Sequence, residues 1–190
     1  RMKILFLNNN VEKIYWAIIK NKPEKHKDSL INWLKKNPKN NKSTAYRKQV
    51  NQSKKAILHY QLIHSMDRYH LIEVKLETGR HHQIRSQLSN IGSPIKGDLK
   101  YGFDRSNPDG SIHLHAQKIS FTHPVNEQKI SIIAPTPNDI LWSECSSKTN
   151  TKPVRLRLFL NQSLTKILIL SLRVQLMLLN WCWMKITKKV

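Results

Sequence analysis

The chain has 190 residues, a length that fits one domain with an appendage, and its 33 Lys and Arg residues outnumber 12 Asp and Glu residues for a formal net charge of +21. Such an excess is typical of chains that bind nucleic acid or an anionic membrane surface. The alternative is a lysine-rich surface that is only solvated and binds no partner. Two cysteines argue against a disulfide framework and, with no visible signal peptide, favour a cytoplasmic location.

The first third of the chain predicts one strand followed by a polar stretch. Residues 5–10 are interpreted as the end of a helix and a turn, and the β-branched and aromatic run at 13–19 predicts a strand. Residues 21–41 are polar around a small apolar island at Leu30, Ile31, Trp33 and Leu34. We interpret this stretch as a long loop or a hairpin insertion.

In the middle of the chain, apolar and polar residues alternate with a period of two. This alternation predicts strands at 56–63 and 69–77, joined by a hairpin turn at 64–68. In the first, Leu58, Tyr60 and Leu62 share a face, as do Ile72, Val74 and Leu76 in the second.

A helix and a second antiparallel pair follow. Apolar residues Ile84, Leu88 and Ile91 predict a short amphipathic helix over 82–91, which Gly92 ends. A turn-rich loop at 103–111 leads to strands at 113–121 and 129–134. Strands with short connections indicate an α+β fold, a mixed, mainly antiparallel sheet with flanking helices.

The composition changes after Glu144. No acidic residue follows it, and Leu158 to Trp183 is rich in leucine and isoleucine without a clear period. A membrane span is disfavoured because Arg173 would cost about 2.5–3.5 kcal/mol near a helix centre, and an interfacial helix is a second alternative. We expect residues 145–190 to be a tail outside the fold, as when a gene is read out of frame.

Four of the five glycines lie at 79, 92, 97 and 102, interleaved with Arg, His and Gln. Glycine is used where the backbone needs positive φ or close approach, so this concentration indicates a site. Arg80 and Arg85 lie at the predicted start of the helix and on its flank. Two guanidinium groups at a helix start suit an anion.

The segments 77–85, 92–98 and 101–102 resemble the central motif of the RluA-type pseudouridine synthases. Residues 114–116 with 121–124 resemble the next block of that family, and residues 11–17 resemble the preceding block. One small departure is His81, where the family more often has Thr or Ser. The resemblance covers about residues 8–142. It implies that residues 1–144 are part of a pseudouridine synthase catalytic domain without its N-terminal half.

The resemblance also implies an activity. The family isomerises uridine to pseudouridine in rRNA or tRNA without a cofactor, on a nucleotide that is flipped out of its stack. By resemblance, Tyr15 packs on the target base and Arg85 pairs with the catalytic carboxylate. In isolation, Tyr15 would be a core residue and Arg85 a surface charge.

RNA binding is expected to involve Arg80, His82, Gln83 and Lys96, of which Arg80 and Gln83 would support the loop or the RNA backbone. No metal site is expected, because the histidines lack ligand spacing. RNA is the expected partner, and the chain is expected to be a monomer away from membranes.

One expected block is absent. The family's catalytic aspartate lies in an H-R-L-D block upstream of the strand with Tyr15, where this chain has no aspartate. Asp67 is rejected as a substitute because it follows Tyr15 and occupies a predicted hairpin turn. Arg85 is therefore expected to be an unpaired cation, with marginal stability and little or no isomerase activity. The alternatives are a non-catalytic basic RNA-binding module and a membrane-surface protein.

Overall fold

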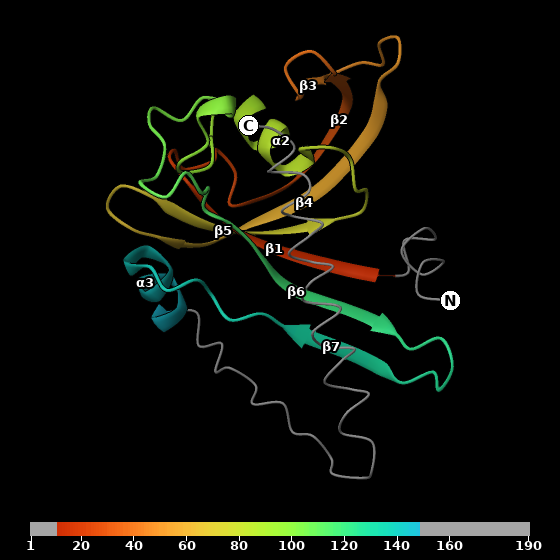
Figure 1. The fold of residues 1–190 in the computed structure, drawn as a ribbon, viewed down its shortest axis with the longest axis vertical. Coiled ribbons are helices and arrows are strands. Elements are labelled where there is room, and N and C mark those ends of the chain that lie inside the picture. The colour runs from red at the N-terminus through yellow and green to blue at the C-terminus, as the bar shows by residue number, and fades with distance from the viewer. Residues whose placement is uncertain (1–10, 149–190) are drawn as a thin grey trace. The chain divides into compact units, whose positions relative to one another are not determined.

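The computed structural model describes residues 11–148, which lie within the first of the two units of the chain, residues 1–152. Its strands form one seven-stranded sheet in the order β3-β2-β4-β5-β1-β6-β7, with antiparallel neighbours throughout (Figure 1). The elements are β1 (Val11–Ile19), β2 (Lys27–Asn37), β3 (Lys42–Tyr46), β4 (Lys54–Ser65), β5 (His70–Leu76), α2 (Gln83–Asn90), η1 (Leu99–Tyr101), β6 (Leu114–Thr122), β7 (Lys129–Ile133) and α3 (Ile140–Lys148). The predicted α+β class is confirmed.

The two central hairpin strands show how alternation sets the faces of the sheet. In β4, Leu58, Tyr60 and Leu62 are buried, and in β5 Val74 and Leu76 are buried beside them. Successive side chains of a strand point to opposite faces, so these residues line one face. The predicted pair and its turn are confirmed.

Residues 21–41 contain strand β2, so the loop alternative is wrong. The hairpin alternative is right except for its bounds, because its second strand, β3, begins at Lys42. Strand β2 pairs with β3 on one side and with β4 on the other. Its alternation was hard to recognise because Asn32 occupies an inward position. The Asn32 side-chain oxygen accepts a hydrogen bond from Gln87 Nε2 at 2.8 Å, which makes an asparagine tolerable there.

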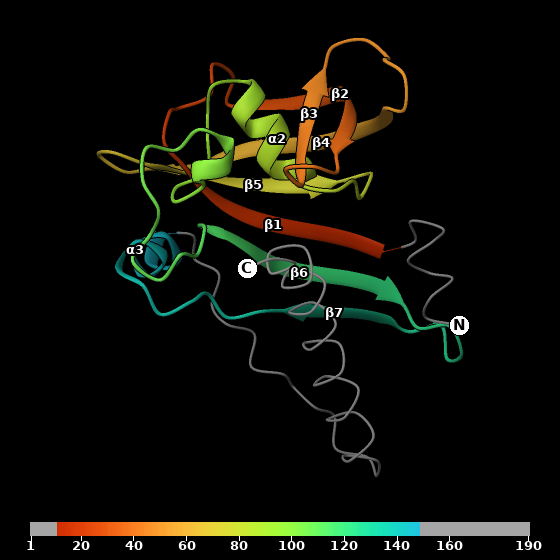
Figure 2. The ribbon, with the colours of Figure 1, turned by 45° about the horizontal axis from the view of Figure 1, so that its top comes forward.

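Helix α2 lies over the β3–β2–β4 end of the sheet (Figure 2). Ile84 and Leu88 of the helix join the core formed with Leu58, Val74 and Ile95. Gly92, at φ +79°, ends the helix: its N–H bonds Ser89 O and the N–H of Ser93 bonds Leu88 O, both at 3.0 Å. This Schellman arrangement satisfies carbonyls at the helix end, as predicted.

Helix α3, which the sequence reasoning missed, packs on the opposite face. Trp142 and Cys145 of α3 contact Trp16, Ile18 and Leu71. The helix runs across position 144, and the predicted boundary there stays a prediction.

Two interpretations, the helix end in 5–10 and the segment 158–183, lie outside the described residues. Within residues 11–148, no helix has the length and apolar character to cross a bilayer.

Candidate active site

Tyr15 lies in a strand of the sheet and points to the face that helix α2 covers, and α2 carries Arg85, the other predicted catalytic residue. Tyr15 in β1 is 4% exposed and belongs to the core cluster that includes Ile84 and Leu88 of α2, the helix that carries Arg85. The pairing of β1 with β6 shifts register between Ile14 and Tyr15. Such a bulge changes the direction of a side chain and is common beside active sites.

Arg85 is paired, so the expectation of an unpaired cation is wrong. Its Nε and Nη2 donate to Asp98 Oδ2 and Oδ1, each at 2.7 Å, with side-chain exposures of 12% for Arg85 and 1% for Asp98. Asp98 lies thirteen residues later in the glycine-rich motif. A two-pronged guanidinium–carboxylate pair fixes both charges, so an unpaired Arg85 is no longer a reason to expect marginal stability.

A second set of contacts holds the other side of Arg85. Its Nη1 lies 3.2 Å from His82 Nε2, and His82 Nδ1 lies 3.0 Å from the hydroxyl of Tyr101. Because a guanidinium only donates, Nε2 of His82 must accept, and Nδ1 carries the hydrogen directed at Tyr101. Arg85 therefore selects the His82 tautomer.

Tyr101 ties this arrangement to the β2–β3 hairpin. Its hydroxyl accepts a hydrogen bond from the N–H of Ser43 in β3 at 2.8 Å, and Arg85 lies 4.8 Å from its ring centre. Burial raises the pKa of Tyr101, with Ser43 and Arg85 opposing that shift. We call Ser43, His82, Arg85, Asp98 and Tyr101 the Arg85 cluster.

The Arg85 guanidinium keeps capacity for a ligand. A guanidinium has five N–H donors, and the contacts with Asp98 and His82 use three of them. Among residues 11–148, the other two donors have no hydrogen-bond partner, on a side chain whose direction is already fixed. Two such donors suit a second carboxylate, a phosphate or a carbonyl of a nucleobase.

Gln83 and Arg80 fasten the loop that precedes α2. Gln83 Oε1 accepts from Thr78 Oγ1 and from the N–H of Arg80, both at 2.9 Å, and its Nε2 donates to Ile57 O at 3.0 Å. Arg80 Nε donates to Lys55 O at 3.0 Å. These contacts support the loop-holding role. Gln83 and His82 are buried, and their RNA-binding roles stay predictions, as does that of Arg80.

Lys96 lies on a different side of the glycine-rich motif. Its Nζ donates to Asn107 Oδ1 at 2.7 Å and lies 5.9 Å from the centre of the Tyr69 ring. Burial lowers the pKa of Lys96. The structure does not bring it into the Arg85 cluster, and its contact with RNA stays a prediction.

The sequence reasoning gave no role to Asp98, Tyr101 or Ser43. Asp98 and Tyr101 lie inside the motif that carries the family resemblance. An acidic residue between two glycines of that motif could have indicated a functional role for Asp98. Ser43 offered no signal, because its contact with Tyr101 joins residues 58 positions apart. Within residues 11–148, no group of His, Cys, Asp and Glu could hold a metal ion.

Comparisons with known proteins agree with the resemblance. The model of the RNA pseudouridylate synthase family matches residues 1–90. A relative from Chlorobaculum parvum, an uncharacterized RNA pseudouridine synthase, is 32% identical over 152 residues, which cover 71% of this chain and 46% of the relative. The ribosomal large subunit pseudouridine synthase D of Xylella fastidiosa is 34% identical over 100 residues, covering 46% of this chain and 30% of the relative. The chain thus spans less than half the length of these relatives.

Solved structures show the same fold. The human RNA pseudouridylate synthase domain containing 4 superposes with a TM-score of 0.59 at 21% identity, covering 77% of this chain and 65% of that one. A second human protein, RNA pseudouridylate synthase domain containing 1, gives a TM-score of 0.59 at 20% identity. The solved structures show the fold alone, and the matched family model and the named relatives support the RluA-type RNA pseudouridine synthase family for this chain.

Proposed function

We propose that this chain holds an extruded uridine of RNA for isomerisation to pseudouridine. The observation that carries the proposal is the Arg85 guanidinium, fixed by Asp98 and His82 with two N–H donors left over. Tyr15 belongs to the core cluster that includes Ile84 and Leu88 of α2, the helix that carries Arg85, and would provide an aromatic ring for the base. Stacking of a base on an aromatic ring contributes about 1–3 kcal/mol.

The reaction needs a nucleophile in addition to these two groups. Isomerisation breaks the bond between N1 of the base and C1′ of the ribose and forms a bond from C5 to C1′. C5 then releases its proton to solvent, and N1 takes up a proton, so the composition is unchanged. A carboxylate assists by attack on the nucleoside, and Arg85 would hold that carboxylate through its remaining donors. Asp98 is then a positioning residue for Arg85, since both of its oxygens already bind that side chain.

The proposed substrate is rRNA. Several relatives are named ribosomal large subunit pseudouridine synthases, including the protein of Xylella fastidiosa. Transfer RNA is the alternative substrate. No cofactor is required by the proposed chemistry, because the base is both the leaving group and the acceptor.

The decisive assay follows the C5 proton. RNA carrying tritium at uridine C5 should bind to the 190-residue chain without tritium release, because the H-R-L-D block is absent from its sequence. A longer chain that includes an upstream H-R-L-D block should release tritium. Normal turnover by the 190-residue chain would contradict the first expectation, and Asp67→Ala would then test the carboxylate rejected above.

A second candidate function is a non-catalytic RNA-binding module. It is favoured by the positive charge of the chain. RNA affinity that falls steeply with salt, without tritium release even from the longer chain, would select this candidate.

A further inference from the structure

Positive charge is concentrated in one part of the described chain. Between Ser29 and Met66 there are eight Lys and Arg residues and no Asp or Glu, whereas residues 67–148 hold ten basic and nine acidic residues. We call residues 29–66 the acid-free segment. Within residues 11–148, none of its eight basic side chains makes an ion pair. This charge therefore remains available to a polyanion.

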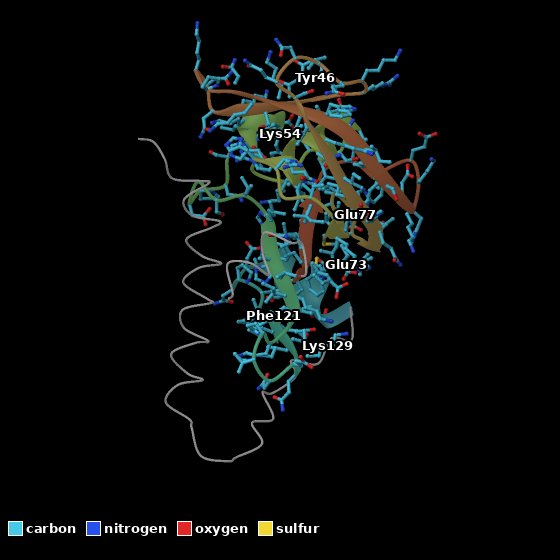
Figure 3. The ribbon with its side chains drawn as sticks, turned by 90° about the vertical axis from the view of Figure 1, so that its right-hand side faces the viewer. Tyr46, Lys54, Glu73, Glu77, Phe121 and Lys129 are labelled. Carbon is cyan, nitrogen blue, oxygen red and sulfur yellow. The ribbon has the colours of Figure 1, made fainter. Side chains whose placement is uncertain are left out.

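The acid-free segment forms one end of the sheet. It comprises most of β2, all of β3 and β4, and the connections between them. Figure 3 shows Tyr46 and Lys54 at this end, away from Phe121 and Lys129 at the other end of the sheet. Within residues 11–148, the net positive charge is thus concentrated at one end of the sheet.

A row of aromatic and basic side chains crosses this end. Tyr46 of β3 is the register partner of Trp33 of β2, and Trp33 is the partner of Lys55 of β4. Residues in register share a face, and Leu34, next to Trp33, points to the other face and is buried. The row therefore lies on the sheet face opposite α2.

The row is accessible. Tyr46 is 37% exposed, and Ile31, two residues before Trp33 on the same face, is 55% exposed. Trp33 lies between them and is half-buried, so the three side chains form one partly exposed apolar patch, and such patches commonly mark an interaction surface. We call Tyr46, Trp33 and Lys55 the stacking row.

We propose that the stacking row binds a single-stranded stretch of the RNA whose uridine occupies the Arg85 cluster. Base stacking on aromatic rings combined with unpaired cations is the usual basis of single-strand binding. A protein partner fits less well, because it would have to neutralise eight cations. This inference rests on the proposed function, since it takes RNA as the partner.

The two surfaces are physically linked at strand β3. Ser43 of β3 contacts Tyr101 and His81 on the α2 side, whereas Tyr46, three residues later, lies in the stacking row on the opposite face. An RNA strand that passes around the edge strand β3 would meet both. The stacking row would thus extend the RNA-binding surface beyond the modified nucleotide.

The test measures binding of a fluorescein-labelled oligouridylate by anisotropy, with the full 190-residue chain. Tyr46→Ala should weaken binding about fivefold to a hundredfold, the range for loss of one stacked base. Tyr46→Phe, which keeps the ring, should bind like the unchanged chain. The matched control is Ile133→Ala, which also truncates an exposed side chain but at the other end of the sheet, on β7, with no expected effect on affinity. Circular dichroism checks that each variant is folded.

A second measurement covers the case in which Tyr46→Ala does not fold. Oligouridylate with 4-thiouridine, crosslinked to the unchanged chain, should label peptides containing Trp33 or Tyr46. Equal affinity of a folded Tyr46→Ala variant, or crosslinks that avoid these peptides, would overturn the inference while leaving the proposed function standing.

Other outcomes are also decisive. If Tyr46→Ala changes the oligomeric state in gel filtration and leaves RNA affinity unchanged, the row is a protein interface and the inference is wrong. If the unchanged chain binds no RNA at all, the proposed function itself fails, and the inference fails with it.

Discussion

Polar groups in the Arg85 cluster are paired with one another, whereas the basic groups of the acid-free segment are not. Asp98 is 1% exposed and uses both oxygens on Arg85. The acid-free segment, in contrast, holds eight basic residues without a carboxylate in its sequence. The comparison assigns a different task to each region. Chemistry on a base needs groups held in fixed directions, as in the Arg85 cluster. Attraction of a polyanion needs solvated charge, as in the acid-free segment.

The largest expected effect is on the Arg85 cluster. Asp98→Asn leaves the buried guanidinium without its counter-charge and should lower the free energy of unfolding by about 3–5 kcal/mol. Urea denaturation measures this change. The control is Asp104→Asn, which breaks the exposed Lys20 ion pair and should cost less than about 1 kcal/mol. Equal stability of the Asp98 and Asp104 variants would remove the distinction between the two regions.

The next effect concerns the backbone that presents Asp98. Gly97 has φ +84°, and an added Cβ would lie 2.7 Å from Ser111 O. Gly97→Ala should therefore cost about 1–2 kcal/mol for the backbone conformation, with about 1–3 kcal/mol more for crowding. Gly92→Ala is the matched control, since Gly92 has φ +79° and no atom within 4 Å of an added Cβ. Thermal unfolding compares them, and a smaller loss at Gly97 than at Gly92 would contradict the crowding argument.

A smaller effect is the pH dependence of stability that comes from His113, whose backbone N–H bonds Lys96 O next to Gly97. Burial, followed by the charge of Lys96, lowers the pKa of His113, while Asp139 opposes the shift. The folded state therefore resists protonation, and the stability from neutral His113 is present above pH 6.5 and is lost as the pH falls through the folded pKa.

His113→Gln should make the decrease in unfolding free energy below pH 6.5 shallower, as measured by urea denaturation across that range. Burial also lowers the pKa of His70 and His115, so the decrease should not vanish entirely. An unchanged slope in His113→Gln would show that His113 does not contribute.

The smallest effect on the fold is expected in the acid-free segment. Lys39→Ser with Lys48→Ser should leave the unfolding free energy within about 0.5 kcal/mol. It should nevertheless reduce the salt dependence of RNA affinity, by up to about 0.7 in logarithmic slope for each phosphate that is no longer neutralised. Removal of the same charge at the other end of the sheet, by Lys118→Ser with Lys129→Ser, should leave the slope unchanged. Equal slopes in the two double variants would mean that the concentration of charge has no role in binding.

Several elements were predictable because a local rule governs each of them. Strands β4 and β5 follow alternation, and α2 ends where Gly92 adopts a positive φ that other residues rarely adopt. The family resemblance was also carried by contiguous residues, so the fold class followed from the sequence. Strand β2 was only half recognised, because its inward Asn32 is stabilised by Gln87, a partner on a distant helix.

The sequence by itself determined the alternation, the helix end, the family motif and the concentration of charge between residues 29 and 66. Only the tertiary structure decided that Arg85 pairs with Asp98, that Gln83 fastens the loop, and that Trp33 and Tyr46 share an exposed face. The physical reason is that periodicity reports which face of an element is apolar. The partner of a buried charge depends on which loops the folded sheet brings within hydrogen-bond distance.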